Sequence, residues 1–384
     1  MDELNKSNRR DVMKLAAAGA DVATLGVSTA QAQTNLRAAG PVIDANMHWL
    51  PETLFSDPQL LEAYMQSVPR QHGIIAKVGP VPGKQVQQMT IEQPPGYEVL
   101  NYVDGEYKPD FRIAAMNAAK VDMAIFRMPC WQEWLDLDLC RKANDGMAEH
   151  MKRHPGRFQA LAVVPPWGSS GALKEIERCI RTLGFCGVQM VAHYGNLYLD
   201  EEAFRPHFRL IHQLGVPVVV HHTALPVDYN SLLKYPNLRR QYGREVAQGT
   251  AVGREIFSDL FDELPNLRFI HSMMGGGFFA FAEMLVPPAG KDAVARFEDQ
   301  GAPIRRHLKE NIYFELSGAP QWGKAQLECA VQVFGADHII YGGSFPIRLD
   351  WFSGGPDYVR NLAISDADKA LILGGNAKRL FKLA

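Results

Sequence analysis

Short apolar runs rich in β-branched residues alternate with longer amphipathic segments from about residue 42 to the end of the chain. Neighbouring parallel strands must be joined by a crossover, usually a helix, and strands buried on both faces are apolar throughout. The alternation therefore predicts an α/β fold with a parallel sheet. The candidate strands are residues 42–44, 123–127, 160–164, 187–190, 216–220, 268–271, 312–315 and 338–341.

Eight such strands fit a (β/α)8 TIM barrel, and 384 residues with 47% hydrophobic content suit one barrel domain at 36–384. The alternative is a doubly wound open sheet, but no glycine-rich dinucleotide turn follows the first strand. An insertion at about 55–112 separates the first two strands. A loop of that length at the carboxyl end of a barrel strand predicts a lid or an oligomer contact.

The first strand carries a pattern that bears on metal binding. An apolar strand that ends in Asp-x-His-x-His presents two imidazoles on one face, because side chains two apart on a strand point the same way. Here the run from Val42 to Pro51 has Asp44, then Asn46 in place of the first imidazole, then His48. A neutral amide is a poor zinc ligand, so the substitution questions the cofactor rather than the fold.

Several segments share their order and spacing with one protein family. They are residues 42–51, 153–158 leading into 162–165, 183–190, 214–221 and 373–381. Together they make the chain resemble the amidohydrolase-related family, which includes aminocarboxymuconate semialdehyde decarboxylase, resorcylate and vanillate-type decarboxylases, and some lactone hydrolases. The resemblance spans residues 42 to 384 and implies the TIM-barrel fold of the metal-dependent hydrolases.

The resemblance also implies a metal held by two histidines of strand one, one of strand five and an aspartate of strand eight, with a further histidine on strand six. In this chain these positions fall on Asn46 and His48, on His221, on Ser344 and on Met273. Two ligands remain, whereas a catalytic zinc normally has three protein ligands and a water. We therefore expect no cofactor; the alternative is a single divalent metal, zinc or manganese, completed by Asn46, His193 or Asp350.

Histidines at strand ends suit acid and base chemistry near neutral pH. We predict that the catalytic residues are His48, His221 and His271. Arginines can hold a carboxylate through two oxygens, and polar groups at strand ends can contact a substrate. The predicted substrate-binding residues are Asn46, Arg127, His193, His222, Ser344 and Arg348.

The function that follows is hydrolysis or carbon-carbon lysis, including decarboxylation, of an aromatic or cyclic unsaturated acid or lactone. One rival is a catalytically silent periplasmic binding protein for aromatic metabolites. The other is a zinc or manganese hydrolase or decarboxylase with rearranged ligands. A net charge of -2 gives no electrostatic argument for nucleic acid as a partner. The resemblance implies a homodimer.

The first 35 residues resemble a twin-arginine export signal. Arg9 and Arg10 precede a small, weakly apolar stretch and an Ala30-Gln31-Ala32 cleavage pattern, which predicts a periplasmic location. No later stretch approaches the ~20 continuous apolar residues of a membrane span. The five cysteines have no zinc-like spacing, and we interpret them as free and mostly buried.

Overall fold

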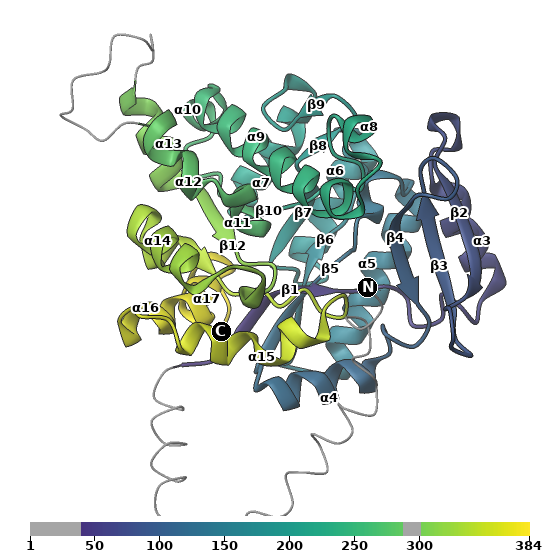
Figure 1. Ribbon diagram of the computed structural model, residues 1–384. Helices are drawn as coiled ribbons and strands as arrows, with labels where there is room; N and C mark the ends of the chain where they lie inside the picture. The colour runs from purple at the N-terminus through teal and green to yellow at the C-terminus, as the bar shows by residue number, and fades with distance from the viewer. Residues whose placement is uncertain (1–39, 287–300) are drawn as a thin grey trace, which may run out of the picture.

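A computed structural model describes residues 40–286 and 301–384. Eight parallel strands form the central sheet in the order β1-β5-β6-β7-β10-β11-β12-β13 (Figure 1). Each predicted strand overlaps an observed one, so the predicted (β/α)8 barrel is confirmed. The strands are β1 (Ile43–His48), β5 (Met123–Arg127), β6 (Phe158–Ala162), β7 (Gly187–Val191), β10 (Val218–His221), β11 (Phe269–His271), β12 (Ile312–Glu315) and β13 (Ile339–Ile340).

The sheet closes between its first and last strands. The Ala45 amide donates to the Tyr341 carbonyl at 3.0 Å, and the His48 amide donates to the Phe345 carbonyl at 2.9 Å. Asp44 adds a further bond between β1 and the segment after β13, because its Oδ1 accepts from the Gly343 amide at 2.8 Å. The barrel thus has no free strand edge here and a single mouth, at the carboxyl ends of the strands.

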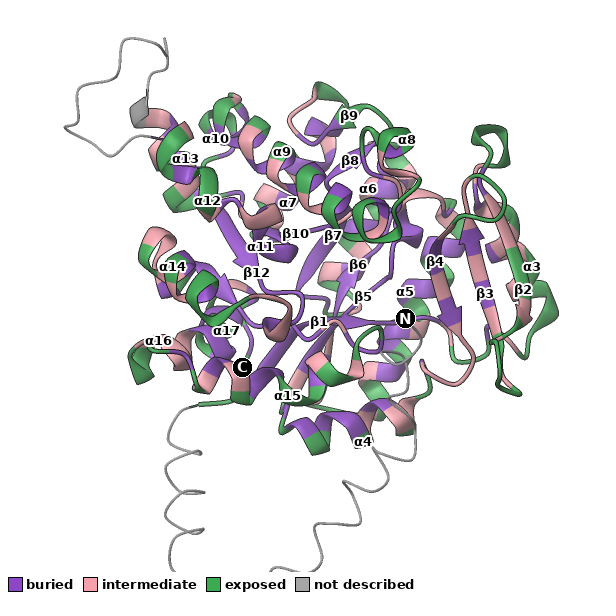
Figure 2. Ribbon diagram, viewed as in Figure 1, coloured by how far each residue is buried: buried purple, intermediate pink, exposed green. Residues whose placement is uncertain are grey.

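Side chains alternate between the interior of the barrel and the surrounding helices, as expected for strands. Ile43, Ile125, Val219 and Ile270 belong to the interior cluster. The strands between these two layers are buried along their length, whereas exposed residues gather on the outer helices (Figure 2). The last residues complete the interior cluster from below, with Leu383 and neighbouring apolar side chains packed against it.

Helices cover the outside of the barrel. Helix α5 shows how the sequence starts one of them: the Asp136 side chain accepts from the Leu139 amide and caps the first turn. Within the described residues, no helix has both the length and the apolar character needed to cross a bilayer. The longer helices are α4 (Pro109–Ala119), α5 (Leu137–Arg153), α6 (Ser170–Arg181), α7 (Arg205–Leu214), α9 (Gly243–Phe257), α13 (Gly301–Asn311), α14 (Lys324–Phe334) and α15 (Leu349–Arg360).

Shorter helices follow some of the strands and complete the carboxyl-terminal part. They are α8 (Tyr229–Leu232), α10 (Leu260–Glu263), α11 (Met273–Gly277), α12 (Phe279–Leu285), α16 (Asp366–Ala370) and α17 (Asn376–Leu380).

The insertion after β1 forms a helix, α3 (Pro58–Ser67), and an antiparallel sheet of β2 (Ile75–Pro80), β3 (Gln87–Glu92) and β4 (Glu98–Val103). This sheet stands at one side of the barrel, on the right in Figure 1. It is tied to the segment around α9: Arg244 donates to the Val99 carbonyl at 3.0 Å, and the Tyr229 hydroxyl donates to the Gln93 carbonyl at 2.8 Å. The insertion is therefore anchored to the chain that follows β10.

Candidate active site

Asn46 lies at the centre of a buried polar network in the mouth of the barrel. Its amide nitrogen donates to Glu315 at 3.1 Å, to Ser317 at 3.1 Å and to Ser344 at 2.9 Å, and its oxygen accepts from Arg127 Nε at 2.5 Å. Two predicted substrate-binding residues, Asn46 and Ser344, are thus in direct contact. Their hydrogen bonds join the ends of β1, β12 and β13.

Arg127 completes this network from the end of β5. Its three nitrogens bond to Asn46, to Ser272 at 2.8 Å and to Glu315 at 2.9 Å, and both charged groups are fully buried. Burial lowers the pKa of Arg127 and raises the pKa of Glu315, and each charge opposes the shift of the other. The guanidinium that we predicted as a free carboxylate anchor is instead held by the protein's own side chains.

His48 and His221 face one another across the mouth. Their Nε2 atoms are 3.3 Å apart, and both rings are almost fully buried. Burial is the main cause that lowers both pKa values well below 6.5, and the positive charge of Arg127 lowers them further. Both imidazoles are therefore neutral at pH 7, with one Nε2 donating to the other. The Nδ1 of His48 is buried without a hydrogen-bond partner among the described residues.

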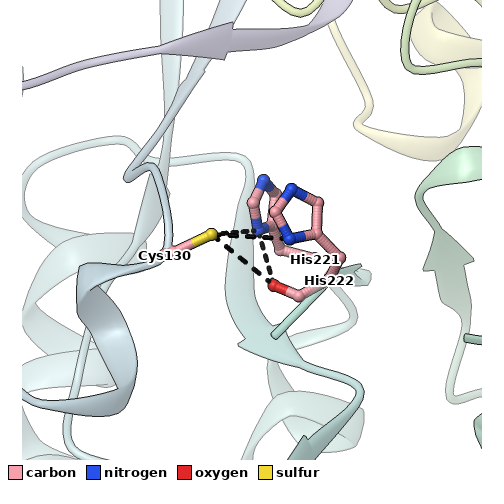
Figure 3. A group of neighbouring side chains, drawn as sticks. All are labelled: Cys130, His221 and His222. Atoms are coloured by element: carbon pink, nitrogen blue, oxygen red, sulfur yellow. Dashed lines mark hydrogen bonds between the residues drawn. The ribbon is translucent and has the colours of Figure 1, made fainter. Parts of the chain in front are cut away.

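Cys130 lies on the other side of His221, in the turn after β5 (Figure 3). Its sulfur is 3.6 Å from Nδ1 of His221 and 3.5 Å from Nδ1 of His222. Burial raises the pKa of the Cys130 thiol to about 12. Sequence reasoning had treated this cysteine as one of five buried thiols. Its position three residues beyond a strand end, at the same edge as His221, was the signal that could have identified it.

The third predicted catalytic histidine, His271, lies outside the mouth, and this prediction was wrong. Its Nδ1 is 2.8 Å from Gln248 and its Nε2 is 2.6 Å from Glu255, both on α9. Side chains alternate along β11, so Ile270 and Ser272 point into the barrel while His271 points toward the helix layer.

The remaining predicted residues lie at the rim. Nε2 of His193 is 3.3 Å from the Thr223 hydroxyl, directly after His222. Arg348 is half-exposed, 3.4 Å from Asp350 and with its guanidinium 4.1 Å from the centre of the Trp351 ring. Asp350 is thus paired at the surface and does not replace a missing ligand. Neither Arg348 nor Asp350 contacts His48 or His221.

Besides Glu315, two further carboxyl groups near the mouth were missed. Burial raises the pKa of Asp44 to about 7. It also raises the pKa of Glu133 to about 8, although the Ala224 amide donates to this side chain at 2.8 Å. Both side chains come from segments next to predicted site residues, but a sequence does not reveal which carboxyl groups the fold will desolvate. Glu133 is protonated at pH 7 and can give up a proton there.

The two sides of the mouth differ in how well their side chains suit the binding of a cation. On one side the Asn46 amide nitrogen points at the oxygens of three neighbours, and the positive Arg127 lies against its oxygen, so this side does not suit a divalent ion. On the other side Cys130, His221 and His222 have ligand atoms within 4.8 Å of one another. Sulfur and imidazole nitrogen are good ligands for ions such as zinc.

A cavity of about 420 Å³ lies apart from these residues, between α3, α5 and the turn after β1. Its walls include Trp49, Tyr64 and His150 but none of the predicted site residues. The histidine pair itself is closed off from solvent in this conformation.

The profile of the family described as Amidohydrolase matches residues 43–383, nearly all of the described chain. The chain belongs to this family. It is therefore an enzyme of the amidohydrolase superfamily, and the resemblance drawn from its motifs is confirmed. Whether it is a hydrolase or a carboxy-lyase is a separate question.

Curated relatives of this amidohydrolase include two decarboxylases. Gamma-resorcylate decarboxylase of Rhizobium sp. (strain MTP-10005) is 31% identical over 302 residues, which cover 71% of this chain and 87% of the relative. The 2-amino-3-carboxymuconate-6-semialdehyde decarboxylase of Dictyostelium discoideum is 31% identical over 288 residues, which cover 71% of this chain and 76% of the relative.

A solved structure with the same fold is the dihydroxybenzoic acid decarboxylase from Polaromonas sp. JS666, with a TM-score of 0.67 and 24% identity over 90% of this chain and 97% of that one. It contains manganese and the inhibitor 2-nitroresorcinol. Our expectation that no cofactor is needed is contradicted by this finding. That expectation rested on the missing ligands at the positions that the resemblance implies, and a missing ligand does not show that an ion is absent.

Proposed function

We propose that this amidohydrolase decarboxylates a hydroxylated aromatic acid. The support that carries the proposal is the activity named for two curated relatives, each 31% identical to this chain over 71% of its length. A further relative is 6-methylsalicylic acid decarboxylase of Penicillium expansum, which is 28% identical over 219 residues. All three names describe loss of a carboxyl group, which favours carbon-carbon lysis over hydrolysis.

The reaction needs one proton and no oxidant. A proton is added to the ring carbon that bears the carboxylate, the bond between this carbon and the carboxylate breaks, and its electron pair restores the aromatic ring as carbon dioxide leaves. The protein must therefore supply a proton donor near the ring and hold the carboxylate out of the ring plane.

His48 and His221 are the groups that we assign to proton handling. Because both imidazoles are neutral at pH 7, one of them can accept a proton from a ring hydroxyl of the substrate. The other imidazole holds the first one in place through the hydrogen bond between their Nε2 atoms. Glu133 is the donor whose pKa suits protonation of carbon, since its pKa of about 8 keeps it protonated at neutral pH. His193 and Arg348, at the rim, are the proposed contacts for the substrate's carboxylate.

A divalent ion at the side of the mouth formed by Cys130, His221 and His222 would supply a Lewis acid that polarises the substrate's oxygens. The Asn46 network on the opposite side joins the ends of five strands, β1, β5, β11, β12 and β13.

The test is incubation of purified enzyme with a panel of dihydroxybenzoates, methylsalicylate and aromatic lactones, with and without added zinc or manganese. Chromatography of the phenol and detection of carbon dioxide should show decarboxylation of at least one acid. Ring-opened lactone as the only product would instead establish a hydrolase. Tight binding of an acid without any turnover would favour a silent binding protein.

We also propose that the enzyme reaches the periplasm through the twin-arginine route and works as a homodimer. The proposed signal, residues 1–35, lies outside the described residues. Its support is the sequence pattern around Arg9 and Arg10.

A further inference from the structure

We propose that the Cys130 sulfur and the Nδ1 atoms of His221 and His222 form a binding site for a single zinc-like ion. The site uses one residue that the resemblance implied as a ligand, His221, and two that it did not. This site rests on the proposed function and specifies the ion and its ligands. Its test measures metal binding and does not depend on turnover.

The distances match those of a tetrahedral site. Zinc bonds to sulfur at about 2.3 Å and to imidazole nitrogen at about 2.0–2.1 Å, so a tetrahedral angle places sulfur and nitrogen about 3.6 Å apart. The two observed sulfur-nitrogen distances are 3.6 Å to His221 and 3.5 Å to His222. The ligand atoms of the three side chains lie within 4.8 Å of one another, and the side chains point toward one another in Figure 3.

The fold supplies this arrangement from two strand ends. His221 is the last residue of β10, and His222 follows it. Cys130 adopts a left-handed backbone conformation, with φ of 66°, in the turn after β5. A non-glycine residue seldom adopts that region, because its Cβ comes too close to the following carbonyl oxygen, and such strain is common where a side chain must be held for function.

His48 acts as the partner that orients one ligand. If Nδ1 of His221 binds the ion, its proton must sit on Nε2, which lies 3.3 Å from Nε2 of His48. Ligating histidines almost always donate their second N–H in this way. The contacts of Nδ1 with backbone carbonyls, 2.9 Å for His221 and 3.1 Å for His222, are then exchanged for bonds to the ion.

The ligand types select the ion. A thiolate and two imidazoles suit zinc or cobalt, whereas manganese prefers oxygen ligands. Three protein ligands also leave a fourth position open, which is the pattern of catalytic zinc sites. This chain would thus differ from the Polaromonas relative, whose structure contains manganese.

Cobalt provides a direct readout, because cobalt bound to thiolate absorbs in the near ultraviolet through sulfur-to-metal charge transfer. Full-length protein stripped with a chelator should take up one equivalent of Co²⁺ with this absorption. Equimolar Zn²⁺ should abolish it, and a tenfold excess of Mn²⁺ should not. Cys130→Ser should lose the band. The matched control is Cys186→Ser, another buried cysteine, whose hydroxyl can donate to the Ala160 carbonyl and which should keep the band.

His222→Ala should weaken Co²⁺ binding by at least about tenfold, as loss of one of three ligands demands, and it serves if Cys130→Ser does not fold. The inference is overturned if the parent protein shows no charge-transfer band, if Cys130→Ser or His222→Ala binds like the parent, or if Mn²⁺ displaces Co²⁺. Failure of the decarboxylase assay with an intact cobalt spectrum would overturn only the proposed function.

Discussion

At the scale of single residues, replacing His48 or His221 should lower catalytic turnover while leaving the fold intact. We expect His48→Asn and His221→Asn each to lower turnover by roughly 10²- to 10⁴-fold, the usual contribution of a general acid or base. Asn keeps a hydrogen-bonding group in place, so the melting temperature should change little. The measurement is kcat with the best acid of the substrate panel.

His72→Asn is the control for this pair, because His72 is an exposed histidine of the insertion. Parent-like turnover by both variants would remove the two histidines from the mechanism and turn attention to Glu133.

Asp44 should make stability depend on pH. Its pKa is about 7 in the folded protein and 3.8 in the usual reference state, so between these values the folded state binds more protons than the unfolded state. Stability should therefore fall as pH rises from about 4 to 7, and then level off. At ~1.4 kcal/mol per pKa unit, the decline amounts to roughly 4 kcal/mol at most.

Asp44→Asn retains the oxygen that accepts from the Gly343 and Asn46 amides but removes the buried charge. Denaturant unfolding between pH 4 and 8 should show a flatter profile for this variant and higher stability than the parent at pH 8. Asp122→Asn, which keeps the acceptor for the Val42 amide, is the control and should follow the parent. An identical slope in all three proteins would contradict the assignment to Asp44.

Several of the residues predicted for the site lie together in the structure. Asn46, Arg127 and Ser344 come together, and His48 meets His221, because each lies near the carboxyl end of a strand that was correctly located. The prediction for His271 was wrong because consecutive residues of a strand point to opposite faces, and His271 lies on the face that packs against the helices. Glu315 could not be recognised, because its importance comes from pairing with Arg127, 188 positions away in the sequence.

At the scale of elements, the periodicity of apolar runs was sufficient to locate all eight strands. It did not reveal the sheet β2–β4, whose strands are partly exposed and mixed in composition. The insertion was recognised only by its length and its Pro and Gly content. Its packing onto the segment around α9 depends on contacts between distant residues, which a single sequence does not show.

Helix α11 approaches the backbone of α9 closely at Gly276. A Cβ on Gly276, whose φ is +69°, would lie 1.9 Å from the Glu245 carbonyl oxygen. Gly276→Ala should therefore force the two helices apart and lower the free energy of unfolding by several kcal/mol, on the order of a severe core substitution.

Gly253→Ala is the matched control on α9, because a Cβ there meets no atom within 4 Å. It should be neutral or stabilise by up to about 1 kcal/mol, the usual gain for alanine in a helix. The measurement is the melting temperature of both variants. Equal melting temperatures would show that α11 can move to accommodate a Cβ at position 276, and they would contradict the prediction.

At the scale of the whole molecule, the proposed export can be tested without any knowledge of the substrate. Residues 1–35 fused to a folded fluorescent reporter should carry it to the periplasm, because the twin-arginine route accepts folded cargo. Changing Arg9 and Arg10 to Lys should retain the reporter in the cytoplasm, as fractionation would show. Retention of the unmodified fusion would contradict the proposal.

The apolar residues that close the floor of the barrel have a consequence for how the protein is made. Lys382 donates to the Gly215 carbonyl at 2.6 Å, and Leu383 packs beneath β1 and its neighbours. The first barrel strand also needs the segment after β13 as its partner. These residues are synthesised after all eight strands, so the barrel cannot close until the chain up to Leu383 has emerged from the ribosome.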